Sequence, residues 1–136
     1  MKVLQVKAVK ENLSQVQEFI MDQLEPFGIP MDIQFQIDMA VEEIFINIAS
    51  YSYENEVGEA TVTCSLSENP LSIEIQFLDN GVPFDPLAKE DADLSVEALE
   101  ERTGGLGIYM VKQTMDSVRY SYVNGKNILT IGKKLE

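Results

Sequence analysis

Apolar residues recur along this chain with two different periods, and each period predicts a different kind of element. Every second residue from position 4 to position 8 is apolar, which indicates an opening strand. Helical spacing follows over 13–24, where Asn12 is expected to cap the helix and Pro26 and Gly28 to end it. After position 30, apolar residues recur every three or four positions as far as 48, which predicts a second amphipathic helix.

The second half of the chain is dominated by alternation with a period of two. The segment 60–77 alternates on both sides of a turn, which predicts an antiparallel hairpin. The segment 118–133 does the same around Asn124 and Gly125, which predicts a second hairpin. Helical spacing over 108–115 predicts a third helix between the two hairpins.

The predicted order is strand, helix, helix, hairpin, long connection, helix, hairpin. This order favours an α/β (α+β) two-layer sandwich, in which a mostly antiparallel, mixed sheet is covered on one face by helices. The 136 residues can bury one core but not two, and they contain no repeat or linker. We therefore expect one domain over 1–136.

Composition and charge narrow the class of function. With 45% hydrophobic and 24% charged residues, the chain has the composition of a soluble globular protein. A formal charge of −13 opposes binding to DNA or RNA, so a bound nucleotide needs backbone N–H groups, a helix N-terminus or a metal ion. The absence of histidine excludes a histidine-based triad. The lone Cys64 and the lack of a membrane-length apolar run favour a cytoplasmic protein with no membrane partner.

Glu43 and Asn47 form the first candidate cluster. They are four residues apart on the second predicted helix, so their side chains lie one above the other. An amide oxygen suits Mg²⁺, and a carboxylate can deprotonate a hydroxyl that attacks a phosphate. A solvated helix edge has the same pattern, so this pair gains meaning only from its neighbours.

Asp79, Asn80 and Gly81 form the second cluster, directly after a strand that ends in Phe77 and Leu78. A carboxylate in this place can accept a hydrogen bond from the exocyclic amine of adenine, and a glycine lets the backbone approach the ring closely. The same residue types are also common in a simple turn.

The third cluster precedes the third predicted helix and consists of Thr103, Gly104, Gly105, Leu106 and Gly107. Unpaired N–H groups and the helix dipole attract phosphate to such a helix N-terminus. No Gly-Lys-Ser/Thr sequence follows to complete a Walker loop, and no third glycine completes a dinucleotide fingerprint. A helix N-terminus with a flexible hinge is the alternative.

In this order and spacing, the three clusters resemble the N, G1 and G2 boxes of the GHKL (Bergerat-fold) ATPases, and the resemblance covers nearly the whole chain. The segments Asp-Asn-Gly-Val-Pro-Phe-Asp-Pro and Gly-Gly-Leu-Gly-Ile-Tyr-Met-Val-Lys look most like those of bacterial anti-sigma-factor serine kinases. The resemblance implies a Bergerat ATP-binding fold, ATP and Mg²⁺ as cofactors, and an ATP lid at residues 80–104.

The resemblance also implies a role for each site residue. Glu43 would be the catalytic carboxylate, Asn47 the Mg²⁺ ligand and Asp79 the adenine-reading residue. Thr130 would assist Asp79, and Arg102 would meet the γ-phosphate or a partner, although a pairing with a neighbouring glutamate accounts for Arg102 equally well. The nucleotide would also contact residues of the two loops, namely Gly81, Thr103, Gly104, Gly105, Leu106 and Gly107.

Two features depart from the family pattern. Tyr51 stands where many relatives have a histidine, and we expect it to pack rather than to catalyse. The lid, with a short helix predicted around 96–101, is more acidic than a phosphate clamp. Its charges are expected to face water or a partner.

Two functions are compatible with these boxes. The first is a protein serine/threonine kinase that phosphorylates a STAS-type antagonist; the resemblance also allows a sigma factor as a second partner, and a homodimer. The second is an ATP-gated binding module with little or no phosphoryl transfer, which has less need of Glu43. A sensor histidine kinase would use dimerisation helices and an acceptor histidine that this chain does not show, and a purely structural domain would make all three clusters coincidences.

Overall fold

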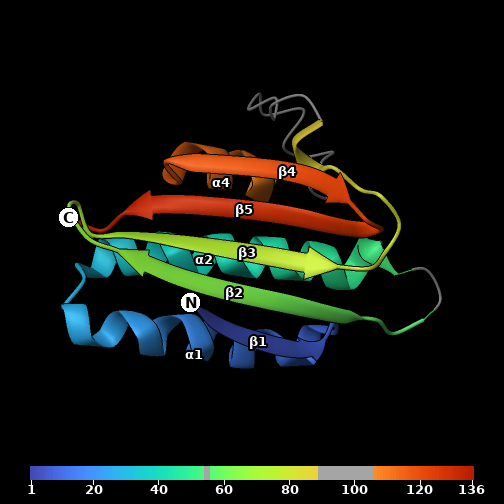
Figure 1. Ribbon diagram of the computed structural model, residues 1–136, viewed down its shortest axis with the longest axis horizontal. Coiled ribbons are helices and arrows are strands. Elements are labelled where there is room, and N and C mark those ends of the chain that lie inside the picture. Colours follow the sequence, from blue (N-terminus) through green and yellow to red (C-terminus); the bar gives the residue numbers. More distant parts are fainter. Residues whose placement is uncertain (54–55, 89–105) are drawn as a thin grey trace.

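The computed structural model describes residues 1–53, 56–88 and 106–136, which form one sheet and one layer of helices (Figure 1). The strands are β1 (Lys2–Lys7), β2 (Glu59–Ser67), β3 (Ser72–Asp79), β4 (Ser117–Val123) and β5 (Lys126–Lys134). The helices are α1 (Leu13–Leu24), α2 (Met31–Asn47) and α4 (Leu106–Thr114), and none of them has the length and apolar content to cross a bilayer. This order confirms the predicted one, while the short helix predicted around 96–101 lies outside the described residues.

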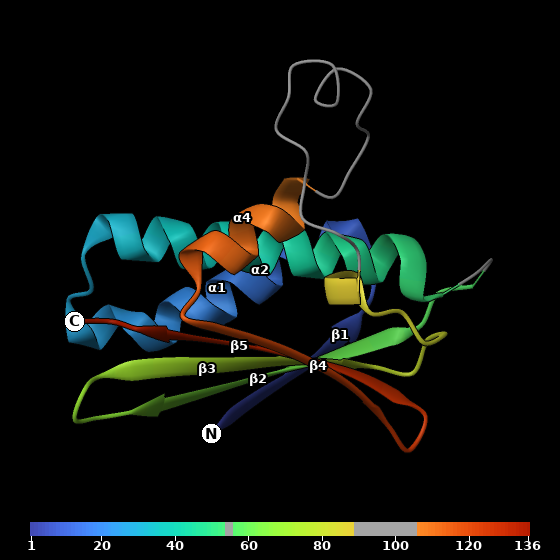
Figure 2. The ribbon, with the colours of Figure 1, turned by 90° about the horizontal axis from the view of Figure 1, so that it is seen from above.

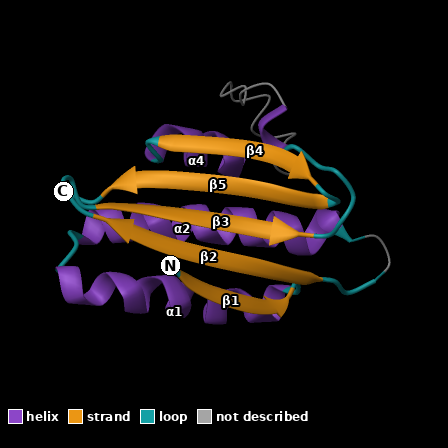
Figure 3. Ribbon diagram, in the orientation of Figure 1, coloured by secondary structure: helices purple, strands orange, loops and turns teal. Residues whose placement is uncertain are grey.

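The five strands form a sheet in the order β1-β2-β3-β5-β4 (Figure 3). Every neighbouring pair of described strands is antiparallel, so this part of the sheet is not mixed as the sequence interpretation expected. After β3 the chain reaches the edge strand β4 by way of α4 and then turns back, so β5 is inserted between β3 and β4. This insertion pairs the end of β3 with the start of β5, where Asp79 lies opposite Asn127.

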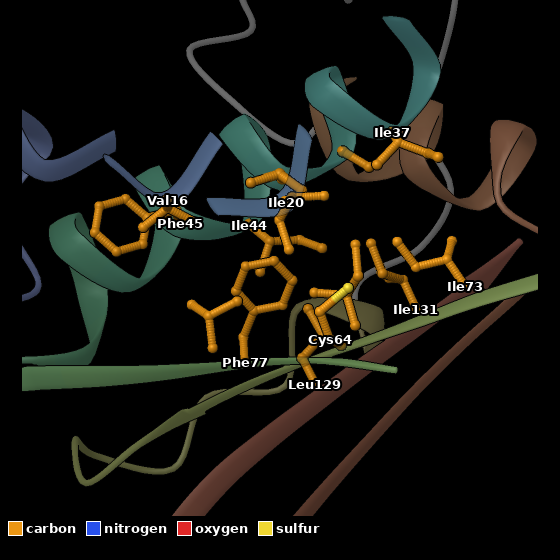
Figure 4. Packing of buried hydrophobic residues seen from close by; sticks show 14 of the residues in the cluster. Val16, Ile20, Ile37, Ile44, Phe45, Cys64, Ile73, Phe77, Leu129 and Ile131 are labelled. Atoms are coloured by element: carbon orange, nitrogen blue, oxygen red, sulfur yellow. The ribbon is translucent and has the colours of Figure 1, made fainter. Parts of the chain in front are cut away.

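The helices cover only one face of the sheet (Figure 2). Ile73, Ile75 and Phe77 alternate along β3 and are buried on that face. Ile37 and Ile44 of α2 are buried against it from the helix layer, as the helical spacing predicts (Figure 4). Each such buried side chain stabilises the fold by about 1.5–3 kcal/mol. The expected two-layer sandwich is confirmed.

Asn12 begins α1 differently from the sequence prediction. It directly precedes Leu13, but its side chain makes no capping hydrogen bond. The Asn12 backbone has φ −92° and ψ 2°, whereas a capping residue is normally extended. Its Nδ2 instead donates to the carbonyl oxygen of Lys7 at 2.9 Å. The side chain therefore ties the start of α1 to the end of β1.

The turn between β4 and β5 has the predicted geometry. Asn124 and Gly125 have positive φ angles of 53° and 78°, which match the right-handed twist of the flanking strands. Because a two-residue turn defines the strand register, it also determines that Tyr122 pairs with Asn127. The separate pairing of β5 with β3 places Asn127 opposite Asp79.

Candidate functional site

A pocket lies at the end of β3, between the sheet and the helix layer. It contains about 350 Å³ of empty space, a figure that includes open solvent. Its apolar walls come from α2 and the turn after it, β3, α4 and β5, with Ile44, Ile48, Phe77, Ile108 and Leu129. Its polar side chains are Asn47, Ser52, Asp79, Tyr120 and Asn127.

Asp79 is buried in this pocket and has three hydrogen-bond donors. Its Oδ1 accepts from Asn127 Nδ2 and from the backbone N–H of Gly81, both at 2.9 Å. Its Oδ2 accepts from Ser52 Oγ at 3.2 Å. A buried charge needs such donors, and a carboxylate has about four acceptor sites. Among the residues that the structure describes, these three donors leave one acceptor site on Oδ2 for a donor that enters the pocket.

Asn127 connects Asp79 to the loop that follows it. Asn127 Nδ2 also donates to the carbonyl oxygen of Val82 at 2.8 Å, and Asn127 Oδ1 accepts from the Phe84 backbone N–H at 3.1 Å. The Tyr120 hydroxyl donates to the same Oδ1. Burial, reinforced by nearby carboxylates, raises the pKa of Tyr120. Asn127 is a pocket residue that the sequence interpretation did not include in the candidate site.

A signal for Asn127 was nevertheless present in the sequence. Asn127, Leu129 and Ile131 occupy every second position of β5 and share its buried face. An amide at a core-facing position of a strand needs partners, so it marks a polar site under the sheet. Ser52 has no comparable signal, because it lies in the π-helical turn Ile48–Ser52 that continues α2.

Gly81 is required where the loop after β3 passes the end of this turn. A Cβ atom at Gly81 would overlap the backbone carbonyl of Ser52. The neighbouring Val82 N–H donates to that same carbonyl oxygen at 2.9 Å. The missing side chain of Gly81 therefore makes room for protein backbone, and its approach to an adenine ring stays a prediction.

Replacing Gly81 with alanine is expected to lower the free energy of unfolding by about 1–3 kcal/mol, because backbone atoms must move to admit the new methyl group. The change should be visible as a lower midpoint in urea denaturation. Gly132→Ala is the matched control, because its Cβ would meet the Ser117 Oγ at 2.6 Å, and that hydroxyl can rotate away. Equal losses in the two variants would contradict the role assigned to Gly81.

Glu43 and Asn47 lie together on α2, as their spacing predicts. Asn47 Nδ2 donates to Glu43 Oε1 at 3.2 Å, and Asn47 lines the pocket. A Cβ atom at Gly107, in the first turn of α4, would overlap the Glu43 carboxylate. The fold thus brings the first and third sequence clusters into contact.

Only part of the third predicted cluster lies within the described residues. Leu106 is the first residue of α4, next to Gly107. Four members of the predicted site lie outside the described residues, namely Arg102, Thr103, Gly104 and Gly105. Most of the predicted lid also lies outside them.

Thr130 does not reach Asp79. It lies one residue from Leu129 and therefore points to the opposite face of β5, where it pairs with Gln76 and Arg119. Asp79 and Asn127 face the helices. Asn127, and not Thr130, donates a hydrogen bond to the Asp79 carboxylate, because side chains alternate between the faces of a strand.

Tyr51 has the packing role expected of it. Its ring lies against Phe84, with centroids 5.8 Å apart and planes tilted by 31°. Phe84 lines the pocket, so this aromatic pair joins the pocket wall to the solvent-exposed surface.

Comparison with known proteins identifies the class. Residues 6–133 match the family described as the histidine kinase-like ATPase domain. The match spans most of the chain, and Asn47 of the first cluster and Asp79 of the second line the same pocket. This protein belongs to the histidine kinase-like ATPase family.

Particular relatives are serine-protein kinases. Serine-protein kinase RsbW of Bacillus cereus (strain ATCC 10987 / NRS 248) is 32% identical over 108 residues, which cover 75% of this chain and 65% of the relative. The same protein of Bacillus thuringiensis (strain Al Hakam) gives the same identity and coverage. The chain therefore spans 65% of the length of these relatives.

Solved structures share the fold at low sequence identity. The RsbU and RsbW domains of a Mycobacterium tuberculosis protein match with a TM-score of 0.63 and 12% identity, over 99% of this chain and 33% of that one. The histidine kinase domain of the Erythrobacter litoralis EL346 blue-light activated histidine kinase matches with a TM-score of 0.59 and 17% identity, over 93% and 60%. These matches confirm the expected fold.

Proposed function

We propose that this chain binds Mg-ATP in the pocket at the end of β3 and transfers the γ-phosphoryl group to a serine or threonine of a partner protein. The observation that carries this proposal is Asp79, a buried carboxylate in an apolar pocket with one acceptor site left. A purine suits such a pocket, because its ring is flat and apolar and its amine is a donor. The relatives named as serine-protein kinases support a hydroxyl as the acceptor.

Asn47 has the chemistry of a Mg²⁺ ligand. Its Nδ2 is held by Glu43, so its Oδ1 is the end of the amide that can bind a cation. Mg²⁺ often takes one or two protein ligands and completes its shell with water and phosphate oxygens. Bound Mg²⁺ would neutralise phosphate charge.

The two oxygens of Glu43 have separate tasks in the proposed reaction. Oε1 accepts from Asn47, which orients the carboxylate, and Oε2 is left for the hydroxyl of the partner. The serine Oγ forms a bond to the γ-phosphorus, and the bond from that phosphorus to the β-bridging oxygen breaks, so ADP leaves with that oxygen. Glu43 takes the proton of the hydroxyl. The first turn of α4, at Gly107, lies beside the same carboxylate and offers N–H groups to phosphate.

The partners follow from the family resemblance. We propose a STAS-type antagonist as the phosphorylated protein and a sigma factor as a second partner. We also propose that this chain is cytoplasmic, forms one domain over 1–136 and pairs as a homodimer. Arg102 and the loop residues Thr103 to Gly105 are proposed phosphate contacts. The relatives named as serine-protein kinases support a serine of a partner protein as the phosphorylated group.

Calorimetric titration with a non-hydrolysable ATP analogue tests the binding site. We expect one molecule bound per chain, and removal of Mg²⁺ with a chelator is expected to weaken binding about tenfold, or ~1.4 kcal/mol, because the phosphates lose the Asn47-bound cation. A matched titration with the GTP analogue should show weaker binding, since guanine presents an oxygen where adenine has its amine. Absence of ATP-analogue binding by the intact chain would contradict the proposal.

One observation favours a second candidate, an ATP-gated binding module. Asn127 bonds both to Asp79 and to Val82 and Phe84, which begin the connection after β3. A ligand that binds the remaining acceptor site of Asp79 therefore joins the same hydrogen-bond network that positions this loop. Nucleotide could then select a partner through the loop without phosphoryl transfer.

A further inference from the structure

The outer side of α2 carries exposed apolar side chains in register. Met31, Phe35 and Met39 are spaced four residues apart and so lie on one face of the helix. Their exposed fractions are 84%, 64% and 44%. Ile37 and Ile44, on the opposite face, are buried against the sheet. We call Met31, Phe35 and Met39 the α2 stripe.

The α2 stripe lies on the open side of the helix layer. α2 contacts both α1 and α4, and it lies between them in Figure 1. Figure 2 shows the sheet on the opposite side of α2 from this outer surface. Single exposed apolar residues are ordinary on a protein surface, but three in register along one helix face form a continuous apolar strip.

The helices α1 and α2 carry acidic side chains around the stripe, whereas α4, which also contacts α2, carries Lys112 in its last turn. Between Lys10 and Lys89 the sequence has no lysine or arginine, and both α1 and α2 fall in this interval. Asp32 and Glu42 are exposed on α2 beside the stripe. Partial burial raises the pKa of Asp38, the next carboxyl along this side, because desolvation disfavours its charged form. Nearby cations would stabilise all three carboxylates.

We propose that the α2 stripe docks a lysine- or arginine-rich amphipathic helix of a partner protein. Apolar side chains of that helix would cover the stripe, and its cations would face Asp32, Asp38 and Glu42. Methionine side chains adapt to different partner shapes, and amphipathic helices commonly dock through apolar residues at this spacing. Charge complementarity selects this occupant, because the net charge of −13 repels nucleic acid and anionic membranes. This inference does not depend on nucleotide binding.

A designed peptide tests the surface directly. The probe is a fluorescein-labelled helix of about 18 residues with leucine at helical spacing and lysine elsewhere, titrated with the whole chain and followed by anisotropy. Phe35→Ser is expected to weaken binding at least about tenfold, because a central aromatic anchor is lost. Val3→Ser is the matched control, because Val3 is 57% exposed but lies on the opposite face of the sheet. It should change binding less than about twofold.

The charge requirement has its own controls. Glu42→Gln is expected to weaken binding of the peptide about threefold. Glu68→Gln, in the exposed turn after β2, should leave peptide binding unchanged. A scrambled peptide of the same composition should bind at least about tenfold more weakly, because it keeps the charge and loses the apolar face. Equal binding by Phe35→Ser and the intact chain, or equal binding of the scrambled peptide, would overturn the proposal.

The same set of variants also tests two other molecules that could cover the α2 stripe, a second copy of the chain and a membrane. Sedimentation would reveal a second copy of the chain as concentration-dependent self-association that Phe35→Ser abolishes and the peptide does not displace. Flotation with phosphatidylcholine vesicles would reveal a membrane if Phe35→Ser abolishes vesicle binding and the peptide does not compete. Either result would overturn the assignment to a basic helix.

Discussion

Replacing Asp79 with asparagine is expected to weaken binding of the Mg-ATP analogue at least about 100-fold, or ~2.7 kcal/mol. If the new amide nitrogen replaces Oδ2, the remaining acceptor is lost and the nitrogen faces Ser52 Oγ, which already donates. If it replaces Oδ1, it faces the N–H groups of Gly81 and Asn127, which also donate. Calorimetric titration measures this loss.

The Asp79→Asn result needs a separate test of folding, because the side chain is buried. Ser52→Ala removes only one donor and leaves the carboxylate intact, so it should remain folded and bind the analogue within about tenfold of the intact chain. Asp116→Asn is the matched control, since Asp116 accepts from the Lys134 N–H away from the pocket. A folded Asp79→Asn variant that binds the analogue normally would remove Asp79 from the site.

Replacing Glu43 with glutamine is expected to lower the rate of phosphoryl transfer by about 10²–10⁴-fold, because glutamine cannot accept the hydroxyl proton. Analogue binding should stay within about threefold, since the glutamine oxygen can still accept from Asn47. The measurement is transfer of label from γ-labelled ATP to a STAS-domain protein. Glu18→Gln, on the exposed side of α1, is the matched control.

The outcome of Glu43→Gln also separates the two candidate functions. Transfer at an unchanged rate would contradict the role of Glu43 as the base. If the intact chain binds nucleotide and its partner but transfers no phosphate, the ATP-gated module replaces the kinase. The network from Asp79 through Asn127 to Val82 would then be the route by which nucleotide affects the partner surface.

Many features of this protein could be predicted locally. Period-two and helical spacing predicted every described strand and α-helix, because an element that buries one face has apolar residues at regular intervals along the chain. Asn124 and Gly125 predicted their turn for a similarly local reason, since few residue types adopt positive φ. Glu43 and Asn47 could be paired because four residues make one helical turn.

The identity of the strand beside β5 was not a local property. Alternation places Asn127 on the core-facing side of β5 and Thr130 on the other side, but it does not say which strand β5 pairs with. Insertion of β5 between β3 and β4 decided the matter, and it placed Asn127 against the Asp79 carboxylate. The same insertion made the described sheet wholly antiparallel.

By itself, the sequence determined the elements, the amphipathic faces and the residue types needed for a nucleotide site, because these depend on spacing along the chain. Only the tertiary structure decided which residues share that site. Ser52, Asp79 and Asn127 are far apart in sequence, and they meet through strand pairing and through the continuation of α2 into its last turn. A hydrogen-bond network of this kind depends on long-range register, which short-range periodicity does not specify.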